Sequence, residues 1–344
     1  FGSMDNHFIM PETMQEVYVP DGVAHFLEHK MFEQENGKNS LDVLMALGVD
    51  ANAYTTNNHT AYLFETTENF YEALDELMDY VQHPYFTDEN VEKEKGIIGQ
   101  EIGMYDDDPG WRLYMNALDC LYHDNAIKID IAGTVESISK IDPDVLYKCY
   151  NTFYHPSNMT MVVCGDFEPE KLLEEIKKRL LPKENQADIK RIYTAKEDKI
   201  NMPEKIAQME VSTPIFMMAY KDIENNQEAA IKKHIAIEIL LNIIIGKSSK
   251  LYKELYEEGL LLAQPDFDYE FSAQYAHTLI SGASKEPKKV AQKITDRIEQ
   301  LKQQGLDDEE FERARRKLYG DYVIEYNSVA NIARMFLADT MKKV

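Results

Sequence analysis

Three residues near the start of the chain carry side chains that can bind a metal ion and use it. His25, Glu28 and His29 lie in the run Val-Ala-His-Phe-Leu-Glu-His, which follows Gly22. On a helix, His25 and His29 project from the same face, so their imidazoles can share one metal ion, of which zinc is the usual one. Glu28 lies beside that face, where it can act as a general base on a metal-bound water. The alternative is two surface histidines and a solvated glutamate on an amphipathic helix.

A second predicted helix, residues 88–105, carries two glutamates within its apolar arc. At 100° per residue, Glu94 and Glu101 fall within about 20° of each other. A buried carboxylate is costly unless it meets a cation or good hydrogen-bond donors. A metal held by His25 and His29 would supply that cation. The alternative is a solvated glutamate pair on a helix whose apolar arc is imperfect.

Turn residues and apolar periodicity predict the elements that position these side chains. The turn at 20–22, with Asp21 as the cap, opens the metal-site helix, which is predicted to reach about residue 35. Segments 50–56 and 60–66 are predicted to form a hairpin. Further helices are predicted at 40–47, 70–81, 111–122, 142–153, 168–180, 227–245, 250–258, 287–304 and 307–326, and further strands at 159–165, 207–211, 215–220, 269–275 and 277–282.

Composition and charge exclude several classes of protein. The chain is 44% hydrophobic and 28% charged, which is typical of a globular protein. A formal net charge of −24 argues against binding nucleic acid or an anionic membrane surface. Cys120, Cys149 and Cys164 lack metal-site spacing and fit free thiols in a reducing compartment, so a cytoplasmic location is expected. The chain begins at Phe1 rather than Met, which leaves a removed signal segment open.

A length of 344 residues predicts two domains. Residues 1–190 are expected to form the domain that holds the metal, and the polar residues 191–204 a linker. Residues 205–344 are expected to form a second domain without metal residues, incomplete at its C-terminus. Strands and helices follow a similar order in both halves, so both are predicted to be of one α+β type.

Three segments together carry a family resemblance. They are residues 22–33 (GVAHFLEHKMFE), the run Asn52-Ala53-Tyr54-Thr55, and the segment from Glu94 to Ile102. They resemble the pitrilysin family of inverted-motif zinc metallopeptidases, which includes insulin-degrading enzyme and the mitochondrial processing peptidase, and in particular its bacterial two-domain type. Residues 248–260 resemble the signature of that family's second domain. The resemblance covers both halves and implies two similar domains, each a mostly antiparallel sheet packed with helices.

The resemblance also implies roles for individual residues. The later glutamate of the family's second motif, here Glu101, is the third ligand of one Zn²⁺ per chain. The earlier one, here Glu94, orients a ligand from outside. The 71 residues between His29 and Glu101 are a few fewer than the family's usual spacing, which a loop deletion would explain. Asn52 and Ala53 match the edge strand to which a substrate peptide adds as a further strand.

Arg315 and Tyr322 match a pair in the family's second half that meets the substrate from across a closed chamber. They lie seven residues apart on the predicted helix 307–326, and so on one face. As catalytic residues they would hold a substrate carbonyl and donate to the developing oxyanion. The resemblance then implies a homodimer, or a dimer with a paralogous chain. Alternatively, Arg315 is one charge in a basic run and Tyr322 belongs to the core.

The residues and the resemblance together predict a zinc-dependent endopeptidase that hydrolyses extended peptides or small unfolded proteins. Its expected partners are a peptide substrate and a second chain, with no nucleic acid and no membrane. Two alternatives stay open. The chain could be the catalytic subunit of a heterodimeric peptide-processing protease, or a peptide-binding scaffold that does not hydrolyse.

Overall fold

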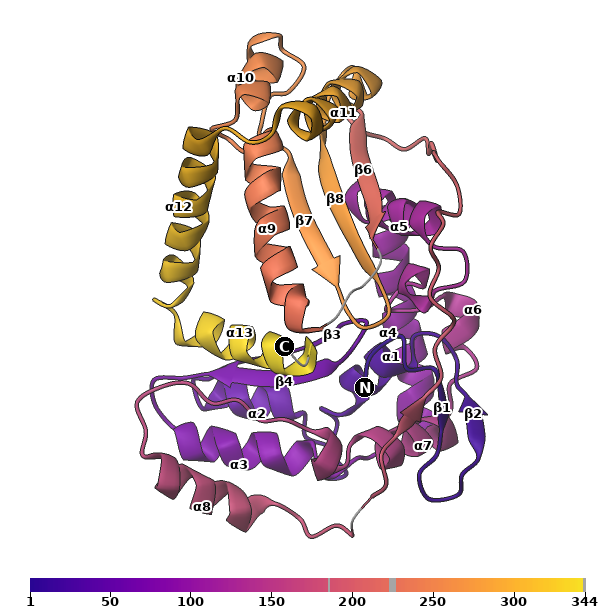
Figure 1. Ribbon diagram of the computed structural model, residues 1–344. Coiled ribbons are helices and arrows are strands. Elements are labelled where there is room, and N and C mark those ends of the chain that lie inside the picture. The colour runs from indigo at the N-terminus through magenta and orange to yellow at the C-terminus, as the bar shows by residue number, and fades with distance from the viewer. Residues whose placement is uncertain (185, 223–226, 343–344) are drawn as a thin grey trace. The chain divides into compact units, whose positions relative to one another are not determined.

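The computed structural model of the chain describes residues 1–184, 186–222 and 227–342. They form two compact units (Figure 1). Unit 1 comprises Phe1–Tyr105 and Ile129–Thr194, and unit 2 comprises Asp106–Lys128 and Ala195–Val344. Each unit combines helices with small antiparallel sheets, which confirms the predicted α+β fold of two domains. None of the described helices combines the length and the apolarity that crossing a membrane requires.

Unit 1 packs a β-hairpin against the helix that carries His25 and His29. Strands β3 (Asp50–Thr55) and β4 (Thr60–Glu65) pair antiparallel, with Asp50 opposite Glu65, and both contact helix α1 (Val23–Lys30). A second antiparallel sheet has the strand order β2-β1-β5. The other elements of unit 1 are β1 (His7–Ile9), β2 (Glu16–Tyr18), β5 (Lys190–Arg191), α2 (Ser40–Ala46), α3 (Phe70–Tyr80), α4 (Asp88–Asp107, in unit 1 as far as Tyr105), α6 (Val135–Ile138), α7 (Pro143–Phe153), α8 (Pro169–Arg179) and the short 3₁₀ helix at Pro156–Asn158.

The core of unit 1 fixes the rotation of α1 about its axis. Phe26, Leu27 and Met31 are fully buried in this core. At 100° per residue, this apolar arc lies opposite the face that carries His25 and His29. Burial of one face therefore sets the direction in which the two imidazoles project.

Unit 2 is built on a three-stranded antiparallel sheet with the order β6-β8-β7. Helix α9 lies alongside β7, and α12 packs against α9 (Figure 1). On β6 lies helix α5, which buries Ala117, Leu118 and Leu121. The elements of unit 2 are β6 (Ile215–Asp222), β7 (Asp266–Phe271), β8 (Ala276–Ala283), α5 (Pro109–Leu121), α9 (Gln227–Ile245), α10 (Lys250–Glu257), α11 (Pro287–Gln304), α12 (Asp308–Glu325), α13 (Val329–Lys342) and the short 3₁₀ helix at Ala126–Lys128.

The domain division departs from the prediction in one segment. The chain passes from unit 1 to unit 2 at Thr194–Ala195, within the predicted linker 191–204. However, Asp106–Lys128, predicted to belong to the first domain, packs with unit 2. The physical reason is the apolar face of α5, which is buried against β6, a strand that follows much later in the chain.

Two predicted strands are wrong, and two α-helices, α6 and α13, were not predicted. Residues 159–165 and 207–211 form no strand. In the first, Val163 packs against α3 and α8 through its side chain while Met161 stays 43% exposed, so an apolar run is used here without strand pairing. In the second, Val211 is 41% exposed. Helix α13 carries apolar residues such as Phe336, which is 58% exposed.

Candidate metal centre

Helix α1 begins at a turn in which only glycine fits. Gly22 caps its N-terminus with φ 89°, and a Cβ there would lie 2.4 Å from the carbonyl oxygen of Ala132. The Ser137 hydroxyl donates to the carbonyl oxygen of Asp21 (2.8 Å), which ties the same turn to α6. These contacts hold the N-terminal end of α1 against the segment around residue 132.

Both ends of α1 differ from the prediction. Asp21 does not cap the helix, because its Oδ1 instead accepts a hydrogen bond from Nδ2 of Asn6 (2.6 Å). The helix ends at Lys30 rather than near residue 35, since Glu33 already forms an antiparallel bridge with Asn39. The residues of the H-x-x-E-H run all remain within the helix.

Three predicted ligands converge at one point in unit 1. Nε2 of His25 lies 3.6 Å from Oε1 of Glu101, and Nε2 of His29 lies 3.7 Å from Oε2 of the same residue. One ligand atom from each residue falls within 4.8 Å of the others. These distances are too long for hydrogen bonds but suit three ligands that each lie about 2 Å from a shared zinc ion. Two imidazoles and one carboxylate are also the donor set of many catalytic zinc sites, so the residues present fit this metal.

Glu94 contacts His29 at the ring nitrogen that does not face Glu101. Its side chain is buried, and Oε1 lies 3.0 Å from Nδ1 of His29. When Nδ1 donates this hydrogen bond, Nε2 keeps its lone pair for a metal. Burial alone would raise the pKa of Glu94, but the His29 hydrogen bond and the Lys30 ammonium hold that pKa below its usual value.

The two histidines titrate differently. Burial, and after it the neighbouring His29, lowers the pKa of His25 to about 4, so His25 is neutral near pH 7 and its imidazole is free to ligate. Burial also disfavours the charged form of His29, but the Glu94 hydrogen bond and nearby carboxylates outweigh it and raise the pKa of His29. A cation bound by His25, His29 and Glu101 would compete with the extra proton of His29, because metal ligation requires a neutral imidazole.

Glu28 lies beside the ligands and is held by a hydroxyl. It is 6% exposed, and its Oε2 accepts a hydrogen bond of 2.5 Å from Oγ1 of Thr55 on β3. Burial raises the pKa of Glu28, although the Thr55 hydrogen bond and His29 oppose that rise. A carboxylate with a raised pKa is suited to accept and return a proton near neutral pH.

Strand β3 has a free edge next to this site. In the described part of the chain, β3 pairs with β4 alone. Ala53 lies opposite Tyr62, but its backbone N–H donates to Oδ1 of Asn52 (2.8 Å) instead of to β4. Asn52 is exposed and Ala53 half-buried. The structure thus places both residues on an edge that could accept another strand.

Arg315 and Tyr322 lie on α12, which belongs to unit 2. Arg315 is exposed and its guanidinium donates to the carboxylate of Glu312 (2.8 and 3.1 Å). Tyr322 is half-buried and packs against apolar side chains of α9 and α12. Its hydroxyl lies 3.5 Å from Oε2 of Glu238. Their predicted catalytic role stays a prediction.

The structure adds three residues to the site that the sequence analysis did not single out. Thr55 bonds Glu28, and the Tyr105 hydroxyl donates to Oε1 of Glu101 (2.8 Å). Lys30 is buried beside Glu94. Tyr105 could have been found from its spacing, because a residue four positions after Glu101 on a helix lies next to it.

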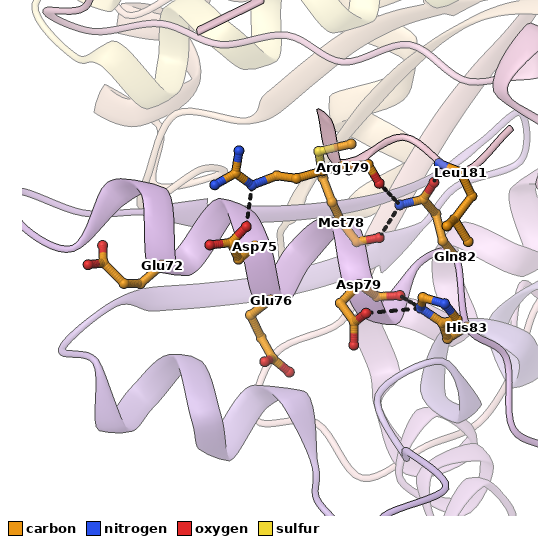
Figure 2. A pocket seen from close by; sticks show the side chains of 9 residues that line it. All are labelled: Glu72, Asp75, Glu76, Met78, Asp79, Gln82, His83, Arg179 and Leu181. Atoms are coloured by element: carbon orange, nitrogen blue, oxygen red, sulfur yellow. Dashed lines mark hydrogen bonds and ion pairs between the residues drawn. The ribbon is translucent and has the colours of Figure 1, made fainter. Parts of the chain in front are cut away.

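A pocket of about 390 Å³ lies elsewhere in unit 1, along α3 (Figure 2). None of the predicted metal ligands lines it. Its Asp75 is paired with Arg179, and its Asp79 with His83 (3.0 Å). The pocket is lined by Glu72, Asp75, Glu76, Met78, Asp79, Gln82, His83, Arg179 and Leu181.

Two models of one peptidase family match the chain. The model described as "Insulinase (Peptidase family M16)" matches residues 14–135, and the model described as "Peptidase M16 inactive domain" matches residues 140–318. The chain belongs to peptidase family M16. The matches confirm the family resemblance drawn from the motifs.

Relatives and solved structures agree with this assignment. The chain is 40% identical over 98% of its length, and 79% of the relative's, to a Bacillus subtilis protein named "Uncharacterized zinc protease YmfH". A crystal structure of a putative M16-like peptidase from Alicyclobacillus acidocaldarius has a TM-score of 0.94 at 36% identity, covering 99% of this chain and 81% of that one. The crystal structure of pitrilysin matches with a TM-score of 0.63, covering 85% of this chain and 33% of the pitrilysin chain. The sequence identity is 17%, so this match shows a shared fold. The M16 chain described here is therefore similar to proteins named as zinc proteases.

Proposed function

We propose that this M16 chain is a zinc-dependent endopeptidase that hydrolyses extended peptides or small unfolded proteins. The observation that carries the proposal is the convergence of His25, His29 and Glu101 on one point, with the buried Glu28 beside them. The names of its relatives as zinc proteases support the choice of metal.

Each side chain has a separate task in this mechanism. His25, His29 and Glu101 would hold zinc, which when bound lowers the pKa of water and polarises a carbonyl group. Glu28 takes a proton from the attacking water and returns it to the leaving amine. The Thr55 hydroxyl holds the Glu28 carboxylate in place during both transfers.

The free edge of β3 supplies the binding mode for the substrate. A peptide that pairs with Asn52 and Ala53 as an added strand is recognised mainly through its backbone. Such recognition tolerates many side chains, so we expect broad specificity for extended segments. Folded proteins, whose backbone groups are already paired, would be poor substrates.

The proposal is tested by separating metal binding from turnover. Glu28→Gln should keep about one zinc per chain and lose hydrolysis of a quenched fluorescent peptide by several orders of magnitude, because only the proton acceptor is removed. Glu101→Gln should lose the metal, as measured by elemental analysis after gel filtration. A Glu28→Gln chain as active as the unsubstituted one would contradict the mechanism.

The same measurements distinguish the alternatives. If Glu94→Gln empties the site and Glu101→Gln does not, the roles of the two glutamates are reversed. If the unsubstituted chain holds zinc and binds peptide but hydrolyses none, alone or as a dimer, it is a peptide-binding scaffold.

A further inference from the structure

Lys30 follows directly after the H-x-x-E-H run, and its side chain is wholly buried. The exposed fraction of Lys30 is 0%, which is rare for lysine. Its Nζ lies 2.7 Å from Oε2 of Glu33 and 3.6 Å from Oε2 of Glu94. A lysine is buried at this cost only where carboxylates compensate its charge, so the pairing with Glu33 and Glu94 is what retains it.

The Glu94 carboxylate uses one oxygen for each of two neighbours. Oε1 faces Nδ1 of His29 at 3.0 Å, and Oε2 faces the Lys30 ammonium. Turning the carboxylate about its last bond would break the His29 hydrogen bond and move Oε2 away from the Lys30 ammonium, with which it makes an ion-pair contact of 3.6 Å. Lys30 therefore fixes the orientation in which Glu94 receives the hydrogen of His29.

Lys30 also affects the net charge of the site. Glu28, Glu94 and Glu101 bring three carboxylates to the site, and Lys30 is the one buried ammonium that the described residues place against them. Glu33, which also contacts the Lys30 ammonium, adds a fourth carboxylate, so one ammonium and a doubly charged zinc ion together offset three of four negative charges. Without Lys30, this group would carry one more uncompensated negative charge even when zinc is bound.

We propose that Lys30 is a positioning residue, whose buried ammonium holds the Glu94 carboxylate so that His29 presents Nε2 to zinc. This inference rests on the zinc binding in the proposed function but not on hydrolysis. It predicts that Lys30 contributes to zinc affinity through Glu94.

The test measures zinc affinity rather than activity. Lys30→Met keeps an unbranched side chain, one atom shorter, and removes its charge, and we expect zinc to bind about tenfold to a hundredfold more weakly in a chelator competition. The matched control is Lys93→Met, since Lys93 is exposed and touches Glu33 (3.9 Å) but is not paired with Glu94. Its zinc affinity should stay within about threefold of the unsubstituted chain.

A double substitution shows whether Lys30 acts through Glu94. If it does, Lys30→Met combined with Glu94→Gln should bind zinc no more weakly than Glu94→Gln alone, because Lys30 then has no carboxylate to position. The d–d spectrum of bound cobalt(II) gives an independent measure, and Lys30→Met should change it as Glu94→Gln does. If Lys30→Met does not fold, Lys30→Gln, alone and with Glu94→Gln, gives the same comparison.

Several results would overturn the inference. One is a folded Lys30→Met chain with unchanged zinc affinity and only a lower melting temperature without metal, which would mean a purely structural role. Another is a loss of affinity that is equally large in the Glu94→Gln background. An unsubstituted chain that binds no zinc refutes this inference and the proposed function together. A chain that binds zinc without hydrolysing peptides refutes the proposed function alone.

Discussion

Among the described residues, the strand residue that donates a hydrogen bond to Glu28 is Thr55. The carboxylate is buried on α1, while the hydroxyl comes from the last residue of β3. This hydrogen bond joins the proposed proton acceptor to the edge strand. Its removal affects Glu28 without touching His25, His29 or Glu101.

Thr55→Val keeps the shape of the side chain and removes the hydroxyl. We expect zinc content to stay near one per chain, while kcat falls about tenfold to a hundredfold, because a hydrogen bond to a charged group is lost. Thr55→Ser, which keeps the hydroxyl, should retain most of the activity. An unchanged kcat in Thr55→Val would show that Glu28 needs no such support.

The buried His277 should make the free energy of unfolding of unit 2 depend on pH. Its exposed fraction is 0%, its Nδ1 bonds the Tyr122 hydroxyl (3.0 Å), and burial lowers its pKa to about 4. As the pH falls below 6.5, the unfolded chain takes up a proton on His277 and the folded chain does not. Acid therefore destabilises unit 2, by about 2 kcal/mol between pH 7.5 and pH 5 from this group.

Fluorescence of Trp111, the one tryptophan of the sequence, reports on unfolding of unit 2. We expect denaturant unfolding of His277→Gln to lose much of this pH dependence, whatever its stability at pH 7.5. His123→Gln replaces an exposed histidine of the same unit and should keep it. Equal pH dependence in both variants would contradict the assignment to His277.

At the scale of elements, the proposed mode of substrate binding depends on the free edge of β3. Ala53→Pro removes a backbone N–H that β4 does not use, so the hairpin should persist. We expect KM for an extended peptide to rise about fivefold to tenfold, as for one lost hydrogen bond, with zinc content and circular dichroism unchanged. Asn52→Ala leaves the N–H in place and should not raise KM; if both variants behave alike, the peptide does not bind along this edge.

Local patterns in the sequence predicted the elements of the site well. Spacing on a helix placed His25 beside His29, and Glu94 on the same face as Glu101, because helical geometry depends on neighbours in the chain. The hairpin at β3 and β4 followed from alternation around a turn. What failed depended on distant partners. Val163 lies in a run that looks like a strand, but whether an apolar run pairs its backbone or only packs its side chains is decided by tertiary contacts.

The same limit explains the residues of the site that were missed. From the sequence alone, Lys30 is expected to be an exposed surface charge. Its burial depends on Glu94, which is far away in the sequence but lies beside it in the fold. Thr55 reads as an ordinary strand residue until α1 packs against β3. Side chains that support a site from outside are recognised by the neighbours they meet, and a single sequence does not supply those neighbours.

At the scale of the whole molecule, unit 2 lacks metal ligands of its own among the described residues, so its residues could contribute to the metal site of another chain. The only potential metal group among the described residues is that of unit 1. The family resemblance predicts that Arg315 and Tyr322 of unit 2 contact the substrate. We therefore propose a dimer, of identical or paralogous chains, in which unit 2 of one chain completes the site of the other.

Mixing two inactive variants tests this proposal. Glu28→Gln lacks the proton acceptor and Tyr322→Phe lacks the hydroxyl, so neither alone should hydrolyse peptide. In a homodimer whose sites are shared in trans, the exchanged mixed dimer contains one intact site and should recover up to about half the activity of an unsubstituted dimer. No recovery despite subunit exchange shown by mass spectrometry, or full activity in a monomer, would refute it.

The packing of α5 on β6 has a consequence for the order in which the protein is made. About 90 residues separate Leu121, at the end of α5, from Ile215, at the start of β6. At a synthesis rate of about 5–20 residues per second, α5 leaves the ribosome about 5–20 s before its partner strand exists. During that time all of unit 1 can fold, whereas Leu118 and Leu121 have no sheet to cover them. The nascent chain therefore exposes the apolar face of α5 between the two sequence segments of unit 1. Chaperones that bind short apolar segments could bind α5 at this stage.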